Sequence, residues 1–451
     1  MALTLGTSTR QGADRCPGTL AVHQANDGGL ARVRVPGGAL TRDALVALAA
    51  WARELGNGRL ELTARANVQL RGLAPGAEVE LSARLAELGL LPSMPHERAR
   101  NVLASPLSGL DGVGVLDVRP LVAELDRRLC ADPELATLPG RFLFALDDGR
   151  GDVGGRRADA AALALPDQRV ALLLAGQDSG LRLPARAAVT GLLTVAAAFL
   201  RSRGGDQRIW RVAELPGGPL ELVDELRAWL GDAVSGGPAI SVPDPDQVGT
   251  VRWTDQSGTV GRIDQIDGRV AIGASVPLGE LTPARCQVIA SVAEREVLLT
   301  PWRGVVLPGL PPAATDLALR RLAGAGLVVD ASSPQLGVSA CTGRPGCAQA
   351  LADVRADASV AAGPAAGTAV PPGQISGQRL PVHWSGCDRR CGRPAGPVVD
   401  VVAEDGGYRV SRDGQVWYAG TDLTRVRATA AHAREAVMPG REGVMLGREV
   451  R

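Results

Sequence analysis

The sequence predicts an α+β fold in which two related half-domains are joined to two α/β lobes. The chain has 451 residues, a length that corresponds to about three domains or lobes. Hydrophobic residues make up 45% of it and charged residues 22%, which is the balance of a globular protein. A pattern of strands and one helix near the N-terminus recurs in the second half of the chain. Such a repeat indicates two half-domains related by a pseudo-dyad.

The repeat is clearest over residues 60–73 and 297–310, which match at a constant offset of 237 residues. Threonine, valine and leucine at positions 63, 68 and 70 recur at positions 300, 305 and 307. Upstream, residues 35–41 resemble residues 276–282. Each copy is expected to contain a strand, a turn, a helix and two further strands.

The first copy begins with alternating residues at 31–35, which are typical of a strand. Thr41 is expected to cap a helix that runs to about Leu55, followed by short strands at 60–63 and 68–70. The second copy has a strand at 269–274. A helix capped by Thr282 then starts with Pro283 at its first position.

The remaining segments form the two lobes. Helices are expected at 119–130, 183–200 and 219–230, and strands at 141–146 and 169–174, before a Gly/Pro-rich connector at 235–249. Further helices are expected at 313–322 and 423–437, with a flexible excursion at 361–373. The predicted domains are a first half-domain (1–80), a first lobe (81–245), a second half-domain (246–315) and a C-terminal lobe (316–451).

Charge composition excludes several functions. Forty-nine basic residues balance 48 acidic ones, so the chain lacks the basic excess of a general nucleic-acid-binding protein. The sequence contains no lysine. Schiff-base catalysis and a P-loop with its phosphate-binding lysine are therefore excluded.

Hydropathy and cysteine usage indicate a cytoplasmic protein. We find neither a signal peptide nor a run of about 18 apolar residues that could span a membrane. Seven cysteines in a chain without an export signal favour a reducing compartment, where thiols serve metals or catalysis.

Four cysteines, Cys341, Cys347, Cys387 and Cys391, give the strongest functional signal. Four thiolates can hold a 4Fe–4S cluster or a zinc ion. Five residues separate the first pair, more than the usual two to four between paired zinc ligands. The spacing favours the cluster, with zinc or unligated thiols as alternatives. Cys16, Cys130 and Cys286 are expected to be buried structural thiols.

Polar residues alternate in the repeat at Arg65, Asn67, Gln69 and Arg71. If this segment is extended, all four side chains lie on one face. Guanidinium groups bind carboxylates through paired hydrogen bonds, so the expected partner is a polycarboxylate. An ordinary solvated strand face is the alternative.

Two other patterns are ambiguous. Residues 149–154 fit G-x-G-x-x-G, but no helix is expected to start there, so we interpret them as a loop rather than a dinucleotide site. His383 lies four residues before Cys387 and is either a hydrogen-bonded structural residue or a metal ligand or proton donor.

The cysteine arrangement, C-x5-C followed after 39 residues by C-x3-C, resembles that of the nitrite and sulfite reductase superfamily. The resemblance implies two ferredoxin-like half-domains and a C-terminal lobe that carries a 4Fe–4S cluster on the four cysteines. It also implies a tetrapyrrole site lined by basic residues. In the same resemblance, Arg100 and Asn101 match a second motif that contacts the tetrapyrrole, and Arg141 matches a cation that binds the substrate. Arg303 is the pseudo-dyad counterpart of Arg65, displaced by one residue from the constant offset.

Departures from the reductase pattern favour one branch of the superfamily. Sulfite reductases carry a Lys-x-Lys pair where this chain has Arg141 and Leu143, and Val398 stands where an acidic residue is usual. Cys16-Pro17-Gly18 and the Arg-Pro-Gly before Cys347 resemble the precorrin-3B synthases of aerobic cobalamin biosynthesis. That resemblance implies a monooxygenase that uses O₂ and NADH to hydroxylate precorrin-3A and close a γ-lactone.

The implied cofactors are a 4Fe–4S cluster, NADH as reductant and, as a further option, a mononuclear non-haem iron. The implied partners are precorrin-3A, O₂ and an electron-donor protein, with neither nucleic acid nor membrane. No 2-His-1-carboxylate pattern identifies catalytic residues. The alternatives are a siroheme-dependent sulfite or nitrite reductase and, from another class, a non-catalytic tetrapyrrole-binding or zinc-stabilised protein.

Overall fold

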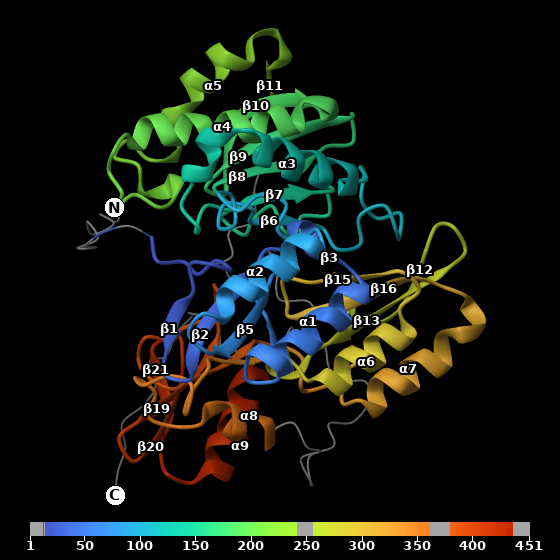
Figure 1. Ribbon diagram of the computed structural model, residues 1–451, viewed down its shortest axis with the longest axis vertical. Coiled ribbons are helices and arrows are strands. Elements are labelled where there is room, and N and C mark those ends of the chain that lie inside the picture. Colours follow the sequence, from blue (N-terminus) through green and yellow to red (C-terminus); the bar gives the residue numbers. More distant parts are fainter. Residues whose placement is uncertain (1–11, 13, 241–255, 361–378, 436–451) are drawn as a thin grey trace, which may run out of the picture. The chain divides into compact units, whose positions relative to one another are not determined.

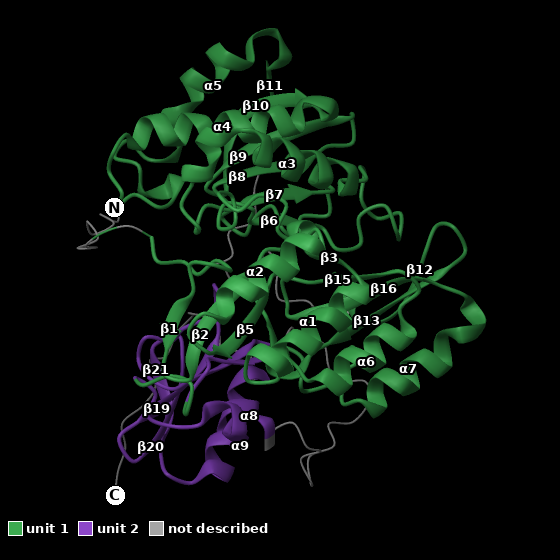
Figure 2. Cartoon of the chain, in the orientation of Figure 1, with its two compact units in different colours: residues 1–337, 344–348 green, residues 338–343, 349–451 purple. Residues whose placement is uncertain are grey.

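The computed structural model describes residues 12, 14–240, 256–360 and 379–435 (Figure 1). The chain forms two compact units (Figure 2). Unit 1 contains residues 1–337 and 344–348, and unit 2 contains residues 338–343 and 349–451. The predicted excursion at 361–373 and most of the predicted connector at 235–249 lie outside the described residues.

Two five-stranded antiparallel sheets in unit 1 correspond to the sequence repeat. The first has the order β1 (His23–Ala25), β2 (Gly28–Val33), β5 (Val68–Leu73), β4 (Leu60–Leu62) and β14 (Glu280–Leu281). The second has the order β12 (Gly261–Asp264), β13 (Val270–Ser275), β16 (Gly304–Leu310), β15 (Glu296–Leu299) and β3 (Ala39–Thr41). Each sheet ends on a strand from the other repeat, because β14 pairs with β4 and β3 pairs with β15.

The helices of the two repeats start where the sequence predicts. Thr41 Oγ1 accepts a hydrogen bond from the Ala44 amide at 3.1 Å and caps α1 (Arg42–Leu55). Thr282 Oγ1 accepts one from the Arg285 amide at 3.3 Å and caps α6 (Pro283–Val292). Helices α1 and α6 contact each other. Two further helices of this part are α2 (Ala77–Glu87) and α7 (Thr315–Gly324).

A six-stranded mixed sheet forms the first lobe of unit 1. Its order is β11 (Ser235–Gly236), β10 (Gln177–Pro184), β9 (Arg169–Leu174), β8 (Ala160–Ala164), β7 (Phe144–Asp147) and β6 (Val102–Ala104). Its helices are α3 (Arg119–Ala131), α4 (Ala188–Arg203) and α5 (Val223–Leu230). Residues Ala185–Arg203 are long and apolar enough to cross a membrane, but this helix contacts β8 and β9 and contributes to the lobe's core.

The first residue of one helix and of one strand in this lobe was predicted incorrectly. The helix expected from residue 183 begins at Ala188, because residues 177–184 form β10 in a hairpin with β9. Ala175 and Gly176 make that hairpin turn with φ of 49° and 82°. The strand expected from residue 141 begins at Phe144, because a turn closes before it through a hydrogen bond from the Phe142 amide to the Pro139 carbonyl.

Unit 2 is a five-stranded sheet with two helices. Its order is β17 (Val338–Ala340), β18 (Val382–Ser385), β19 (Val399–Glu404), β20 (Gly407–Arg412) and β21 (Gln415–Gly420). The first three strands are parallel, and the last three form antiparallel hairpins. The helices are α8 (Val354–Val360) and α9 (Leu423–Glu435). The parallel strands place the residues that follow β17 and β18 at one edge of the sheet.

Candidate functional site

The β4–β5 turn carries Arg65. The sequence predicted one shared face for residues 65, 67, 69 and 71 on the condition that the whole segment is extended, and this condition is not met. Residues 64–66 form a turn in which Ala66 has a φ of 52°. Thr63 Oγ1 holds the turn by accepting hydrogen bonds from the amides of Arg65 (3.2 Å) and Asn67 (3.1 Å). Only Gln69 and Arg71 lie on β5 itself, so the four polar side chains do not share one strand face.

Several predicted residues meet at the turn formed by Gly140 and Arg141. Arg65 donates hydrogen bonds to the carbonyls of Gly140 (3.4 Å) and Arg141 (2.9 Å). Asn101 Nδ2 also donates to the Gly140 carbonyl, at 2.8 Å, and Asn67 Nδ2 donates to Asn101 Oδ1 at 3.3 Å. Unit 1 therefore brings Arg65, Asn67, Asn101 and Arg141 together from segments far apart in the sequence.

Arg71 and Arg100 are buried in ion pairs of their own. Arg71 contacts both oxygens of Asp27, at 2.8 and 3.0 Å, and its Nη2 donates to the Gly346 carbonyl at 3.0 Å. Arg100 contacts both oxygens of Asp126, each at 2.7 Å. A guanidinium group that already holds a carboxylate in this paired manner has little capacity left for a second one.

The other three predicted binding residues differ in their surroundings. Gln69 Oε1 accepts from Arg32, and Gln69 Nε2 donates to Glu61 at 3.1 Å. The Arg141 side chain is 52% exposed and lies over the Trp210 ring, 4.8 Å from its centroid. Arg303 occupies the β15–β16 turn with a φ of 61°. Its counterpart at the offset of 237 residues is Ala66, which has a φ of 52°.

A group around Cys16 was not predicted. Arg32 Nη1 donates to Cys16 Sγ at 3.3 Å and Arg34 Nη2 donates to it at 3.5 Å. Arg34 is only 2% exposed, and its Nη1 has no acceptor among the described residues. Burial, together with nearby arginines, lowers the pKa of Arg34 to about 9 and that of Arg65 to about 10. The alternation of Arg32 and Arg34 along residues 31–35 was the sequence signal that could have identified them.

Crowded cations of this kind favour an anion. Arg32 and Arg65 each contribute to lowering the pKa of Arg34, so their positive charges repel one another at short range. A bound carboxylate or a negatively charged sulfur relieves that repulsion. This part of unit 1 is therefore chemically suited to bind an acidic group.

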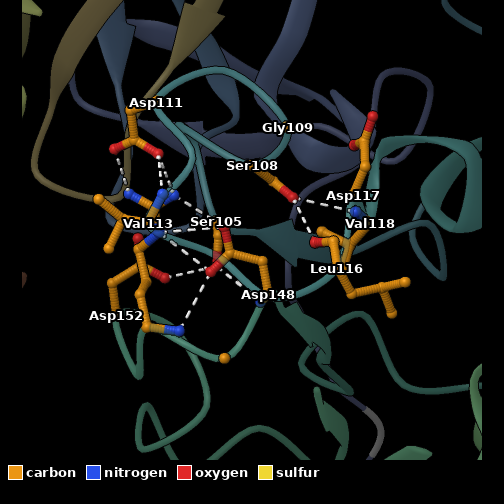
Figure 3. Close-up of polar contacts among 12 residues, drawn as sticks. Ser105, Ser108, Gly109, Asp111, Val113, Leu116, Asp117, Val118, Asp148 and Asp152 are labelled. Atoms are coloured by element: carbon orange, nitrogen blue, oxygen red, sulfur yellow. Dashed lines mark hydrogen bonds and ion pairs between the residues drawn. The ribbon is translucent and has the colours of Figure 1, made fainter. Parts of the chain in front are cut away.

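The G-x-G-x-x-G segment is a loop, as predicted. The Asp147 carboxylate accepts hydrogen bonds from the amides of residues 149, 151, 153 and 154. Asp148 pairs with Arg150, which also pairs with Asp111, and Asp152 accepts from Ser105 Oγ at 2.6 Å (Figure 3). Carboxylate oxygens of Asp147, Asp148 and Asp152 lie within 4.8 Å of one another, but each of these side chains has its own partners in the loop. We assign them a structural role.

Unit 2 contains three of the four predicted cluster ligands. Cys341 directly follows β17, and Cys387 lies two residues after β18. Since β17 and β18 are adjacent and parallel, both cysteines lie at the same sheet edge. The Gly386 amide donates to Cys341 Sγ at 3.1 Å. Cys347 belongs to residues 344–348, which are part of unit 1. The four-cysteine ligand set stays a prediction.

His383 has the hydrogen-bonded structural role that was one of its two predicted roles. It is fully buried in β18. One ring nitrogen, Nδ1, lies 2.9 Å from Ser339 Oγ, and the other, Nε2, lies 3.1 Å from the Cys391 carbonyl oxygen. The ring therefore links β17 to the loop that carries Cys391.

The three scattered cysteines differ more than the sequence indicated. Cys286 is buried on α6, as predicted. Cys16 and Cys130 are only partly buried, contrary to the prediction. Burial raises the pKa of Cys286 to about 12, while burial and the Asp126 charge raise the pKa of Cys130.

Comparison with known proteins identifies the half-domains. Residues 23–88 and 263–325 match the family model of the nitrite/sulfite reductase ferredoxin-like half domain. The chain is 27% identical over 425 residues to a precorrin-3B synthase of Sinorhizobium sp., covering 89% of this chain and 82% of the relative. It is also 27% identical over 423 residues to a ferredoxin–nitrite reductase of Synechococcus elongatus, covering 86% and 78%.

A solved structure shares the fold. The structure of the Mycobacterium tuberculosis NirA protein matches with a TM-score of 0.69 at 23% identity, covering 87% of this chain and 76% of that chain. The predicted fold class, with two ferredoxin-like half-domains and α/β lobes, is thereby confirmed.

Proposed function

Because two segments of this chain match the nitrite/sulfite reductase ferredoxin-like half domain, we propose that it is an oxidoreductase of the precorrin-3B synthase type. In this proposal it acts in aerobic cobalamin biosynthesis, in the cytoplasm. Its substrates are precorrin-3A, O₂ and NADH, and its product carries a new hydroxyl group and a γ-lactone. The similarity to the Sinorhizobium synthase, which extends over 89% of the chain, supports this branch.

The environment of Leu143 is the observation that favours the synthase over the sulfite reductases. This residue stands where the resemblance to sulfite reductases requires the second cation of a Lys-x-Lys pair. Leu143 is 4% exposed within the hydrophobic core of unit 1, and the chain has no lysine to replace the missing charge. A site that reduces a small inorganic anion needs such cations, whereas a site for a large polycarboxylate can use the arginines that remain.

The arginine group of unit 1 fits a tetrapyrrole with several acid side chains. Arg65 is crowded by other cations, Arg32 and Arg211. We assign carboxylate binding to Arg65 together with Arg141 and Arg303. Asn67, Gln69, Arg71, Arg100 and Asn101 support them, since their side chains are already engaged with neighbouring protein groups.

The cysteines fit a 4Fe–4S cluster. We assign Cys341, Cys347, Cys387 and Cys391 as its ligands. The hydrogen bond from the Gly386 amide to Cys341 Sγ supports this assignment, because amide donors to the ligand sulfurs stabilise cluster thiolates and tune their potential. When bound, the cluster transfers electrons one at a time. NADH supplies these electrons, through an electron-donor protein. A mononuclear non-haem iron is a further possible cofactor, with no ligand set assigned.

The second candidate is a siroheme-dependent nitrite or sulfite reductase. The observation that favours it is the similarity to the Synechococcus nitrite reductase, whose identity equals that of the synthase. The two candidates differ in what the tetrapyrrole does. The tetrapyrrole is a substrate that is released as product in the synthase, and it is a resident cofactor in the reductase.

Turnover with isotopically labelled oxygen tests the proposal. The purified holoenzyme is supplied with precorrin-3A, NADH, an electron-donor system and ¹⁸O₂. We expect a product that contains one labelled oxygen atom and is not formed under nitrogen. Reduction of nitrite or sulfite, with precorrin-3A left unchanged, would instead support the second candidate.

A further inference from the structure

The surroundings of Cys16 single out its sulfur among the cysteines outside the predicted cluster. Two guanidinium groups, from Arg32 and Arg34, donate hydrogen bonds to Cys16 Sγ at 3.3 and 3.5 Å. The segment that carries Cys16 is fixed in place. The Cys16 amide donates to Asp14 Oδ1 at 3.0 Å, and the Arg141 amide donates to Asp14 Oδ2 at 2.9 Å.

Gly140 brings the chain close to this sulfur. A Cβ atom at Gly140 would lie 2.9 Å from the Cys16 Cβ, so any other residue there would displace the cysteine or the turn. Cys16 is nevertheless only partly buried.

Arg34 provides an independent sign of a missing ligand. Its side chain is almost completely buried, and Nη2 points to Cys16 Sγ. Nη1, on the same guanidinium group, is buried and has no acceptor among the described residues. A buried charged donor without an acceptor is costly, so an oxygen atom bound beside Cys16 would satisfy it.

The other two cysteines outside the predicted cluster have different environments. Cys130 also interacts with a guanidinium group, that of Arg100, but burial and the Asp126 carboxylate outweigh it and raise the pKa of this thiol. Cys286 is buried among apolar residues of α6 and its neighbours. Reactive cysteines lie in electropositive, partly exposed surroundings such as those of Cys16.

We propose that Cys16 is a peroxide-reactive thiol whose site is completed by Arg32 and Arg34. The deprotonated sulfur attacks one oxygen of hydrogen peroxide, a sulfur–oxygen bond forms, and the oxygen–oxygen bond breaks. The sulfur loses two electrons to become a sulfenic acid, and the peroxide is reduced. The departing oxygen accepts a hydrogen bond from Arg34 Nη1, takes up a proton from solvent, and leaves as water.

Competitive labelling of the full-length holoenzyme tests this proposal. The protein is exposed to substoichiometric hydrogen peroxide, trapped with dimedone and mapped by mass spectrometry. We expect Cys16 to be labelled at least about ten times faster than Cys130, with Cys286 slower still. Equal labelling of Cys16 and Cys130, or no labelling of Cys16, would overturn the proposal.

A pair of variants tests the role of the guanidinium groups. Arg34→Gln is expected to slow labelling of Cys16 at least about fivefold and to leave that of Cys130 unchanged. Arg119→Gln is the control, because Arg119 pairs with Asp117 and makes no hydrogen bond to Cys16. If Arg34→Gln does not fold, Arg32→Gln provides the same comparison. An unchanged Cys16 rate in a folded variant would contradict the assigned role of the arginines.

Discussion

At the residue scale, the arginines of unit 1 differ in what their guanidinium groups contact. Arg71 and Arg100 are each bound to a carboxylate of the protein, whereas Arg65 donates only to main-chain carbonyls. We therefore propose Arg65, rather than Arg71 or Arg100, as a carboxylate-binding group. This difference separates the arginine proposed to bind substrate from arginines held in ion pairs of the fold, and each group is expected to have a distinct mutational phenotype.

Replacing Arg65 with Ala is expected to weaken binding of the tetrapyrrole substrate at least about tenfold, because a charge-assisted hydrogen bond contributes about 1.5–3 kcal/mol. The cluster absorbance is expected to stay unchanged. Substrate titration monitored by fluorescence or calorimetry measures the effect. Wild-type affinity in a folded Arg65→Ala protein would refute the proposed binding role.

Replacing Arg100 with Gln is expected to act on stability instead. The change leaves the Asp126 carboxylate without its partner, and breaking a buried ion pair in this way costs about 3–5 kcal/mol. Asp126 is partly exposed, which places the expected loss in urea denaturation toward the lower end of that range. A loss below about 0.5 kcal/mol would show that this pair is not needed for folding.

Asp152 gives unit 1 a predictable pH dependence. Burial and, to a smaller extent, the nearby Asp147 charge raise its pKa to about 7. Because the folded state holds the proton more tightly than the unfolded state, the stabilisation is fully present below about pH 4. It is lost as the pH rises through 7.

The Asp152→Asn variant is expected to remove this loss. Between pH 5 and pH 8, the free energy of unfolding of the wild type is expected to fall by about 1–3 kcal/mol more than that of the variant. Denaturant titrations at the two pH values measure the difference. Parallel pH profiles for the two proteins would show that Asp152 titrates normally.

At the element scale, the two repeats share the same helix caps and turn conformations although their sequences differ. A threonine caps the helix of each repeat, and two residues with positive φ precede each swapped strand. They are Gly37 (64°) and Gly38 (75°) in the first repeat and Leu278 (55°) and Gly279 (73°) in the second. The conformation is thus kept even where the residue is not glycine, and each half-domain contributes an edge strand to the other sheet.

Replacing either capping threonine with alanine is expected to destabilise unit 1 by about 1 kcal/mol, because one helix amide loses its acceptor. Thr41→Ala and Thr282→Ala are matched variants at pseudo-equivalent positions. Thermal denaturation measures both, and Thr→Ser at the same positions, which keeps the hydroxyl group, is the control. A loss as large in the serine variants as in the alanine variants would rule out capping as the cause.

The elements predicted correctly are those with local signals. The caps, the helix starts and the repeat register depend on residues only a few positions apart, such as Thr282 and Pro283. The Arg65 turn was missed because alternation alone does not reveal the left-handed backbone of Ala66. The partners of Arg71 could not be predicted, since Asp27 and Gly346 are 44 and 275 residues away along the chain. Such pairing depends on the tertiary fold.

At the scale of the whole molecule, the half-domains and the first lobe form unit 1, which contains the arginine group and Cys16. The Gly346 carbonyl, next to Cys347, accepts a hydrogen bond from Arg71 within the same unit. Unit 2 supplies the parallel strands that end at Cys341 and near Cys387. In the proposed assignment, carboxylate recognition lies in unit 1, and three of the four cluster ligands lie in unit 2.

The central claim is that the chain binds a 4Fe–4S cluster and treats a tetrapyrrole as a substrate rather than as a resident cofactor. Anaerobic purification followed by metal analysis and a visible spectrum on the same sample tests it most directly. We predict about four irons per chain, or about five with an additional non-haem iron, together with acid-labile sulfide, broad cluster absorption and no porphyrinoid bands. A sharp tetrapyrrole spectrum that survives chromatography, or zinc in place of iron, would contradict the claim.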